Sequence, residues 1–232
     1  MSKRAKTLLA GGAAGVVALT AVFMEPWEGT KNLAYWDHLG SVWTVCTGET
    51  KGVKKGDRYT DEECAKMLRA TLEKDYHQPL TKCIPGFDGY PMGWQVAMLS
   101  LTYNIGTGAA CKSTAARRAI AGDLEGSCQA MTWFNKAGGK VVRGLKLRRE
   151  MGDATRIGEL EICLAGLEMP SSPTQSVPVP VPRPNDVAKS SQKGAEDAIE
   201  APAGSLMAVG MFIAVVAAVG GLIFIRRRKG GQ

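Results

Sequence analysis

Two long uncharged apolar stretches confine the globular part of this 232-residue chain to the region between them. Residues 204–225 (GSLMAVGMFIAVVAAVGGLIFI) supply the roughly 20 apolar residues that cross a bilayer, and a basic RRRK sequence follows them. We therefore predict a C-terminal transmembrane helix over residues 204–229. The Pro-rich sequence before it argues against the alternative, a buried helix of a soluble fold.

The first apolar stretch, residues 7–24 (TLLAGGAAGVVALTAVFM), is weaker because glycines and alanines dilute it. We expect it to be apolar enough to enter a membrane and weak enough to leave again. A cleaved signal peptide is one alternative, since a short basic head precedes the run, but the run ends in Phe-Met-Glu-Pro rather than in a small-x-small cleavage site. An ordinary, permanent signal anchor is the other alternative.

The positive charge of the chain is concentrated beside these two stretches. The formal net charge is +7, of which residues 1–24 contribute +3 and residues 226–229 contribute +4, whereas residues 25–169 hold 19 basic and 18 acidic side chains. Lys and Arg beside apolar segments mark the cytoplasmic side of a membrane. We therefore expect an inner-membrane protein with both termini in the cytoplasm and residues 25–203 on the outer side. Nucleic acid is not an expected partner.

All six cysteines lie between the two apolar stretches, and none forms a Cys-x-x-Cys pair. The two histidines are not placed as ligand partners for them, so we expect no metal site. An even number of widely spaced cysteines favours three disulfides in an oxidising compartment such as a periplasm. Fifteen pairings are possible. Proximity in the sequence favours Cys46–Cys64, Cys111–Cys128 and, by remainder, Cys83–Cys163.

Residues 25–168 are predicted to form a compact, mostly helical domain. Thr60 and Glu63 make a capping box that begins a helix, and Trp43-Thr44-Val45 between two glycines indicates a short β-structure. Further helices are expected over residues 93–106, 113–123 and 126–139. Residues 169–203 form a linker whose Val-Pro repeats extend the backbone by about 3.1 Å per residue.

Two carboxylates near the start of this domain carry the chemistry. Glycoside hydrolysis needs one carboxyl to protonate the leaving oxygen and a second to manage water or the sugar cation. Glu28 and Asp37 are nine residues apart, so one can end a helix while the other enters a hairpin. The spacing alone is weak, because acidic residues are common on solvated surfaces.

The residues around these carboxylates make the case specific. The sequence EGTKNLAYWDHLGSVWTVCTGET, then LTYNIGTGAACKST, then WFNKAGGKVVRGLKLRRE resembles, in order, the phage-type lysozymes of glycoside hydrolase family 24, above all the lambdoid phage endolysins. This resemblance implies a two-lobed α+β fold, mainly helical, with a small β-hairpin region. It also implies a muramidase without a cofactor that cleaves peptidoglycan between N-acetylmuramic acid and N-acetylglucosamine, for lysis of the host by a phage or prophage.

The resemblance assigns roles to individual residues. Glu28 is the general acid, Asp37 is the second carboxylate, and Thr44 helps to hold the attacking water of an inverting reaction. The segment from Asp37 to Thr44 is one residue longer than in the family, with Ser41 as the extra residue. The family's Gly-His-Thr reads Gly-Glu-Thr here, around Glu49.

Other residues are expected near the substrate. Tyr35 and Asn104 are plausible cleft residues, and Arg148 or Arg149 should reach Glu28 and orient its carboxylate. Trp133 is expected in the core rather than as a sugar platform. The basic stretch 112–149 forms a solvated surface, some of which can attract the anionic cell wall.

Two other functions stay open at this point. A lytic transglycosylase needs one Glu and no water-holding Asp, and a catalytically inactive wall-binding module, tethered or packaged in a virion, needs neither. The presence of both carboxylates disfavours each alternative. We expect a monomeric catalytic domain.

The apolar stretch and the catalytic helix compete for the same residues. In the lysozymes that the chain resembles, the catalytic Glu ends a packed helix, which corresponds to residues 16–27 here. These residues cannot be in a bilayer and beside the active site at once, so the inserted form should be inactive. This resembles the signal-arrest-release endolysins. Since residues 7–24 contain no Cys, topology alone must be the control, with loss of membrane potential as the trigger.

Overall fold

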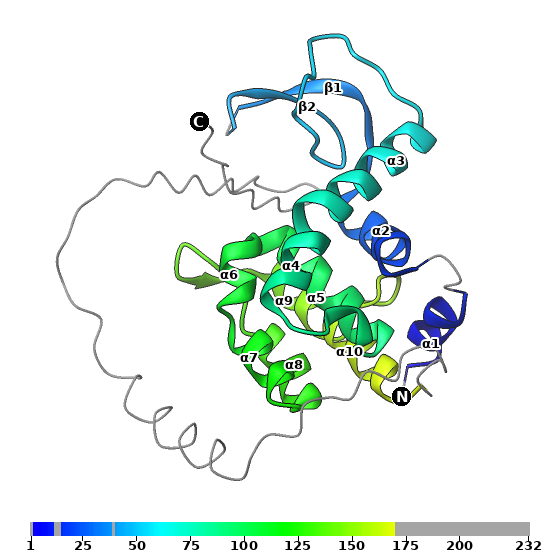
Figure 1. Cartoon of the computed structure of the whole chain (residues 1–232). Coiled ribbons are helices and arrows are strands. Elements are labelled where there is room, and N and C mark those ends of the chain that lie inside the picture. Colours follow the sequence, from blue (N-terminus) through cyan, green and yellow to red (C-terminus); the bar gives the residue numbers. More distant parts are fainter. Residues whose placement is uncertain (1, 12–14, 39, 170–232) are drawn as a thin grey trace, which may run out of the picture.

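The computed structural model describes residues 2–11, 15–38 and 40–169 (Figure 1). The predicted transmembrane helix and nearly all of the predicted linker lie outside these residues. Within the described ranges, no helix combines the length and the hydropathy needed to cross a membrane. The apolar N-terminal stretch forms two helices, α1 (Lys3–Ala10) and α2 (Gly15–Glu28), and both pack on the domain.

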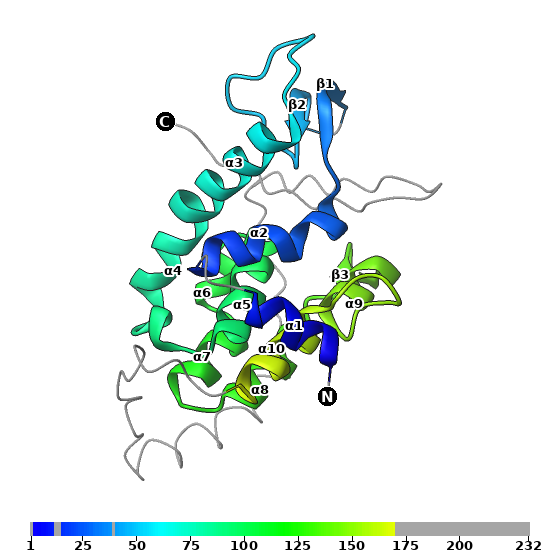
Figure 2. The same ribbon diagram turned by 90° about the vertical axis from the view of Figure 1, so that its right-hand side faces the viewer.

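The domain has two lobes, as predicted (Figure 1). The smaller lobe is an antiparallel hairpin of β1 (Lys31–Asp37) and β2 (Val42–Cys46). Helix α3 (Asp61–Thr71) leads from the hairpin into the larger, helical lobe (Figures 1 and 2). A second small hairpin pairs β3 (Lys136–Ala137) with β4 (Lys140–Val141). The mainly helical α+β fold class is thereby confirmed.

The predicted capping box is present at the start of α3. The Thr60 hydroxyl accepts from the Glu63 amide at 3.2 Å, and the Glu63 carboxylate accepts from the Thr60 amide at 2.7 Å. The helical path continues through a π-helical turn, η1 (Leu72–His77), into α4 (Gln78–Cys83). Apolar residues at helical spacing are buried along this path, which fixes the rotation of α3 against the rest of the domain.

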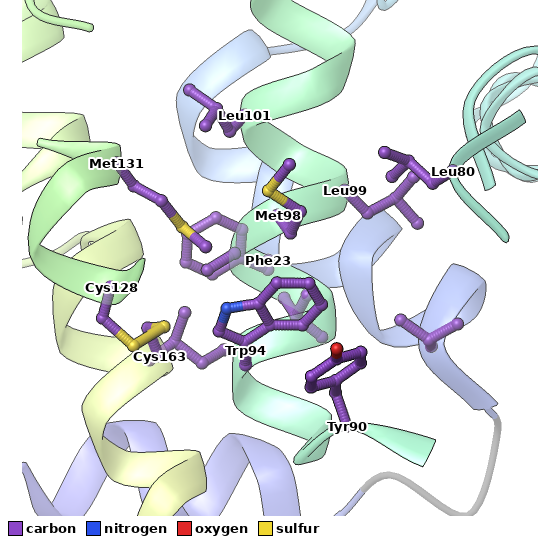
Figure 3. Close-up of a cluster of buried hydrophobic side chains, with 14 of the residues drawn as sticks. Phe23, Leu80, Tyr90, Trp94, Met98, Leu99, Leu101, Cys128, Met131 and Cys163 are labelled. Carbon is purple, nitrogen blue, oxygen red and sulfur yellow. A yellow bond between two sulfur atoms is a disulfide. The ribbon is translucent and has the colours of Figure 1, made fainter. Parts of the chain in front are cut away.

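Helix α5 (Met92–Ile105) is the centre of the helical lobe, packed between α2 and α10 (Glu159–Leu167). The backbones of α5 and α10 touch, since a Cβ on Gly93 would lie 2.2 Å from the Ile162 carbonyl oxygen. Fully buried Trp94 lies beside Tyr90 (Figure 3). Its indole N–H donates to the Ser127 hydroxyl at 2.8 Å. Phe23 and Met24 of α2 are buried in the same core, so the core fixes the position of α2 and of Glu28 at its end.

Three further helices complete the lobe: α6 (Thr107–Cys111), α7 (Thr114–Ile120) and α8 (Leu124–Met131). Gly122 follows α7 with a φ of +86°, a conformation that is common for a glycine just after the end of a helix. The helix predicted over residues 126–139 is wrong in its second half. Helix α8 stops at Met131, and residues 136–141 form the β3–β4 hairpin instead, because Gly138 and Gly139, with φ of +56° and +77°, adopt a turn rather than a helical conformation.

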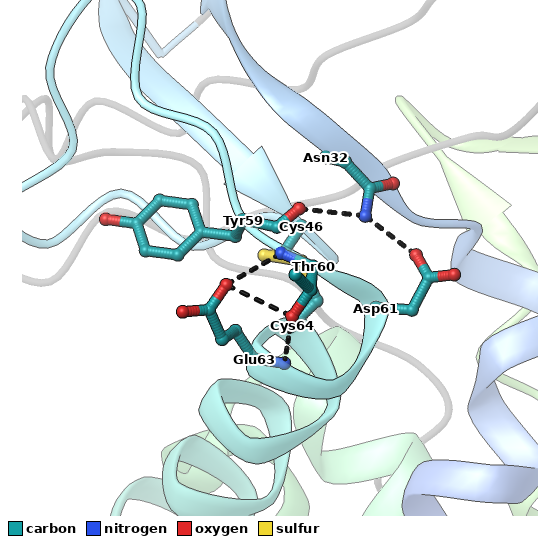
Figure 4. The surroundings of a disulfide bond; sticks show 7 residues. All are labelled: Asn32, Cys46, Tyr59, Thr60, Asp61, Glu63 and Cys64. Atoms are coloured by element: carbon teal, nitrogen blue, oxygen red, sulfur yellow. Dashed lines mark hydrogen bonds between the residues drawn. A yellow bond between two sulfur atoms is a disulfide. The ribbon is translucent and has the colours of Figure 1, made fainter.

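The three disulfides agree only in part with the expectation. Cys46–Cys64 is confirmed and ties the hairpin to the start of α3 (Figure 4). The other two predicted pairs, Cys111–Cys128 and Cys83–Cys163, are wrong. The structure joins Cys83 to Cys111 and Cys128 to Cys163 (Figure 3). The physical reason is helix packing: α4 lies against α6, and α8 lies against α10, so partners in space replace neighbours in sequence.

Candidate active site

Glu28 is the last residue of α2, as expected from the predicted helix over residues 16–27. Gly29 ends the helix with a φ of +66°, a conformation that glycine adopts without steric cost, and the chain then enters β1. The Glu28 side chain is only 4% exposed. Burial of a carboxylate at this depth requires a charged or hydrogen-bonding partner.

Arg148, near the end of α9 (Arg143–Arg149), is that partner. Its Nη1 donates to Glu28 Oε1 at 2.5 Å. Its Nη2 donates to the Ser100 hydroxyl at 3.1 Å, and its Nε lies 3.4 Å from Glu159 Oε1. Of the two arginines expected near Glu28, Arg148 therefore makes the contact. Arg148 of α9 thus holds the Glu28 carboxylate, and Ser100 of α5 and Glu159 of α10 hold Arg148.

Arg149 forms a second layer of the same network. It donates to Glu159 Oε1, to Asn104 Oδ1 and, at 3.2 Å, to the Phe134 carbonyl oxygen. Asn104 is only 8% exposed at the end of α5. Its amide oxygen is thus engaged in holding Arg149, and its predicted contact with substrate stays a prediction.

The network contains two carboxylates and two guanidinium groups, and its charges oppose the cost of burial. Burial disfavours the charged form of Arg148, but the carboxylates of Glu28 and Glu159 outweigh it and raise the pKa of Arg148. Burial, together with the neighbouring charge of Arg148, lowers the pKa of Arg149 although Glu159 opposes the change. A buried set of this kind is costly to break, because each partner that remains is then an uncompensated charge.

The hairpin presents the other predicted catalytic residues on one face. Tyr35 pairs with Thr44, and Asp37 pairs with Val42. Alternate residues of a strand share a face, so Tyr35, Asp37 and Thr44 lie on the same side. Trp36 and Trp43 lie on the opposite side, with ring centroids 5.5 Å apart.

The extra residue before Thr44 is absorbed outside the paired strands. Ser41 has a φ of +49°, and strand pairing resumes directly after it at Val42. Gly40 lets the turn approach Asp37 closely, since a Cβ there would lie 2.8 Å from Asp37 Oδ2. Thr44 is buried, and its hydroxyl lies 3.4 Å from the Val42 carbonyl oxygen. The insertion therefore leaves Thr44 on the face of Asp37.

Trp133 is not in the core, contrary to the expectation. It is 57% exposed, and the Arg118 guanidinium lies 5.6 Å from its ring centroid. Helix α8 ends two residues earlier, so Trp133 follows the turn outward while Phe134 packs against the core.

Sequence reasoning missed Glu159 and Ser100. Glu159 begins α10 in an otherwise apolar sequence, ELEICLAGL, and a carboxylate among buried residues requires a cationic partner. The acidic residue in this apolar sequence could therefore have predicted a buried ion pair at Glu159. Ser100 carries no such signal, because hydroxyls are common inside helices. Among residues 2–11, 15–38 and 40–169, no group of three or more His, Cys, Asp or Glu side chains is placed to hold a metal ion.

Comparisons with known proteins agree with this geometry. Residues 25–152 match the family model described as phage lysozyme. The SAR-endolysin of Enterobacteria phage P21 is 34% identical over 170 residues, which cover 69% of this chain and 95% of that protein. The solved endolysin from Escherichia coli O157:H7 phage FAHEc1 superposes with a TM-score of 0.52 at 32% identity, covering 62% of this chain and 90% of that one. The active form of the P1 phage endolysin Lyz shares the fold with a TM-score of 0.53 at 24% identity, covering 69% and 91%. The chain therefore belongs to the phage lysozyme family.

Proposed function

We propose that Glu28 and Asp37 are the acid and the second carboxylate of a muramidase that cleaves the β-1,4 bond between N-acetylmuramic acid and N-acetylglucosamine. Family membership makes the chain a glycoside hydrolase that acts on peptidoglycan in host lysis. The observation that carries the residue assignment is the buried contact between Arg148 and Glu28 at the end of α2. It fixes the direction of one carboxyl group, while the β1–β2 register fixes the face of the other.

The proposed reaction follows from these positions. Glu28 protonates the glycosidic oxygen as the bond to the leaving sugar breaks. Asp37, with the Thr44 hydroxyl beside it, takes a proton from a water that attacks the anomeric carbon from the opposite face. Arg148 does not touch the reacting atoms; it holds the Glu28 carboxyl against rotation. Tyr35 lies on the same face as Asp37 and is proposed to contact the sugar.

Clearing of purified cell walls tests the assignment. Glu28→Gln and Asp37→Asn should each lower the rate by about 10²–10⁴-fold, the usual contribution of an acid–base group. Asp57→Asn is a matched control at another acid of the hairpin lobe, whose carboxylate accepts from the Lys54 amide at 2.8 Å, and it should not change the rate. Equal clearing by wild type and Glu28→Gln would remove the assignment. Products with 1,6-anhydro ends would indicate a lytic transglycosylase instead.

We further propose that the structure describes the released, active form of a membrane-inserted precursor. Phe23, Met24 and Trp27 of α2 are buried in the domain, and these residues cannot be in lipid at the same time. While residues 7–24 are inserted, Glu28 is within a few residues of the membrane surface, and α2 is not packed in the core of the domain. Loss of membrane potential is the proposed trigger for exit. The name SAR-endolysin of the phage P21 relative supports this reading.

The proposed location is the host inner membrane, with the catalytic domain in the periplasm. Residues 204–229 would keep the active enzyme near the membrane, and the Val-Pro linker would set its reach into the wall. A reporter fusion that places residue 232 outside the membrane would refute this topology.

Membrane exit is testable at positions that the docked form leaves free. Thr7, Ala10 and Gly11 are exposed, and a Cβ on Gly11 meets nothing closer than 3.7 Å. Changing all three to Leu should retain the segment in the bilayer and delay lysis without disturbing the docked helices. The matched control changes the same three residues to Ser and should advance lysis. Equal lysis times for the Leu and Ser variants would contradict control by exit. Gly15 is unsuitable for this test, since its φ of +74° would strain a Leu in the docked form as well.

A further inference from the structure

Helix α10 begins with two buried carboxylates that face different partners. Glu159 and Glu161 are 0% and 4% exposed. Glu159 receives Arg148 and Arg149 of the candidate active site. Glu161 receives the basic head of the chain, which the proposed reaction does not use. Figure 2 shows α1 lying against α10, with the N-terminus beside it.

Arg4 makes a forked contact with Glu161. Its Nε and Nη2 donate to the two carboxylate oxygens, each at 2.7 Å. The same guanidinium donates to the Asp153 carbonyl oxygen at 2.5 Å and to the Met151 carbonyl oxygen at 3.1 Å. The Ser2 hydroxyl also donates to Glu161. Forked, charge-assisted contacts of this kind specify both distance and orientation.

The carbonyl groups that Arg4 contacts belong to the loop between α9 and α10. Asp153 organises this loop by accepting from the backbone amides of Thr155 and Arg156, and from the Arg156 guanidinium. The loop is closed tightly, since a Cβ on Gly158 would lie 2.0 Å from the Glu150 carbonyl oxygen. A displacement of residues 151–153 would therefore be transmitted along the loop.

The far side of this loop holds the residue next to Glu28. The Trp27 indole donates to the Ile157 carbonyl oxygen at 2.8 Å, and the Arg156 guanidinium stacks 4.1 Å from the centre of its ring. The N-terminal end of the loop, residue 150, comes directly after Arg148 and Arg149 of α9 in the chain. The loop thus joins both partners of the Glu28–Arg148 contact.

We infer that Arg4 and Glu161 form a latch through which the docked basic head positions Glu28 and Arg148. Arg4 is a positioning residue: it fixes the loop 150–158, and the loop fixes Trp27 and the end of α9. The same basic head that marks the cytoplasmic side of the precursor then completes the active site after release. This inference rests on the proposed function, to which it adds a second contribution: docking of α2 gives full activity only when α1 is also latched.

The test uses the purified full-length chain with three variants of the head. Arg4→Met removes the fork and one charge. Arg4→Lys keeps the charge and loses the fork. Lys6→Met is the matched control, because Lys6 lies on the same helix and pairs at 2.8 Å with Glu168, where the two side chains are 37% and 33% exposed, without touching the loop. Glu161→Gln tests the latch from its other side.

The readouts are kcat and KM on purified peptidoglycan, and hydrogen exchange of residues 150–158. We expect Arg4→Met and Glu161→Gln to lower kcat about tenfold with KM within about twofold, and to speed exchange in the loop, as loss of a charge-assisted hydrogen bond of ordinary strength would do. Arg4→Lys should be intermediate, and Lys6→Met should match the wild type. Exchange in α5 serves as the measure of global folding and should not change.

Each other result overturns the latch. If Arg4→Met gives the same kcat and the same loop exchange as Lys6→Met, the Arg4–Glu161 contact does not position the active site. If exchange rises without a change in kcat, the loop does not position the active site; if kcat falls without a change in exchange, Arg4 does not act through the loop. Failure of the proposed function is recognised separately, because a wild-type chain that releases no sugar from peptidoglycan still reports the latch by exchange.

Discussion

Glu28 is held by Arg148, which in turn contacts side chains of two further helices far away in the sequence, whereas Asp37 is held by the register of one short hairpin. The surroundings of Glu28 are a buried ionic network that exists only when α2, α5, α9 and α10 are packed together. The surroundings of Asp37 are local, and a disulfide ties the hairpin to α3. Two carboxylates proposed for one reaction thus depend on different levels of structure. The proposed control of activity by docking of α2 would act on the surroundings of Glu28 without disturbing those of Asp37.

Removal of Arg148 should have the largest effect on stability, because Arg148 links Glu28 to the rest of the buried ionic network. Arg148→Met leaves Glu28 and Glu159 buried without their shared cation, which typically costs about 3–5 kcal/mol. Arg143→Met on the same helix is the matched control, since Arg143 is exposed, and should change the free energy of unfolding by less than about 0.5 kcal/mol. Urea unfolding measures both variants. Similar losses in the two variants would show that the network is not the source of stability.

Removal of disulfides should separate the two regions. The Cys46→Ser/Cys64→Ser pair should loosen the hairpin around Asp37, and the Cys128→Ser/Cys163→Ser pair should loosen α10 beneath Glu28. Each loss is expected to cost about 2–4 kcal/mol. Hydrogen exchange should place the first effect in residues 31–46 and the second in residues 159–167. Peptide mapping that finds Cys111 joined to Cys128 would contradict the connectivity on which this prediction depends.

Loss of the capping box at the start of α3, next to the hairpin that carries Asp37, should lower the free energy of unfolding by a smaller amount. Thr60→Ala removes the hydroxyl that accepts from the Glu63 amide (Figure 4), and loss of such a cap costs about 1 kcal/mol. Thr60→Ser retains the hydroxyl and should retain most of the stability. The network around Glu28 should not respond, so wall-clearing activity of the remaining folded protein is expected to stay at the wild-type level.

Acidification should have the smallest effect, limited to α1 and to the loop 150–158 that Arg4 contacts. Burial would raise the pKa of Glu161, but hydrogen bonds from Arg4, Ser2 and Gly158 outweigh it, so the pKa is lowered below the ordinary value of a glutamate. A lowered folded-state pKa contributes stability that is present above the unfolded-state value and is lost as pH falls through the folded-state value. Protection of residues 3–10, measured as exchange relative to the intrinsic rate at each pH, should therefore fall below about pH 4.5 in the wild type. In Glu161→Gln this protection should be low and nearly independent of pH, and a parallel pH dependence in that variant would exclude Glu161 as the titrating group.

The sequence by itself determined the features that depend on near neighbours. The capping box at Thr60, the hairpin face that carries Asp37 and Thr44, the helix that ends at Glu28 and the Cys46–Cys64 pair all lie within short stretches of chain, where residue type and spacing decide the geometry. The motifs that identified the family are of the same kind.

Only the tertiary structure decided which distant segments meet. The pairing of Cys83 with Cys111, the exposure of Trp133, the use of Asn104 to hold Arg149 and the three arginine partners of the α10 carboxylates all depend on helix packing. A buried charge requires an opposite charge beside it, and the sequence contains many possible partners. The close contact of α5 and α10 at Gly93, and the packing of α1 and α2 against these two helices, determine which partners meet. Packing of this kind is a property of the whole core, because each helix is placed by all the side chains that it buries.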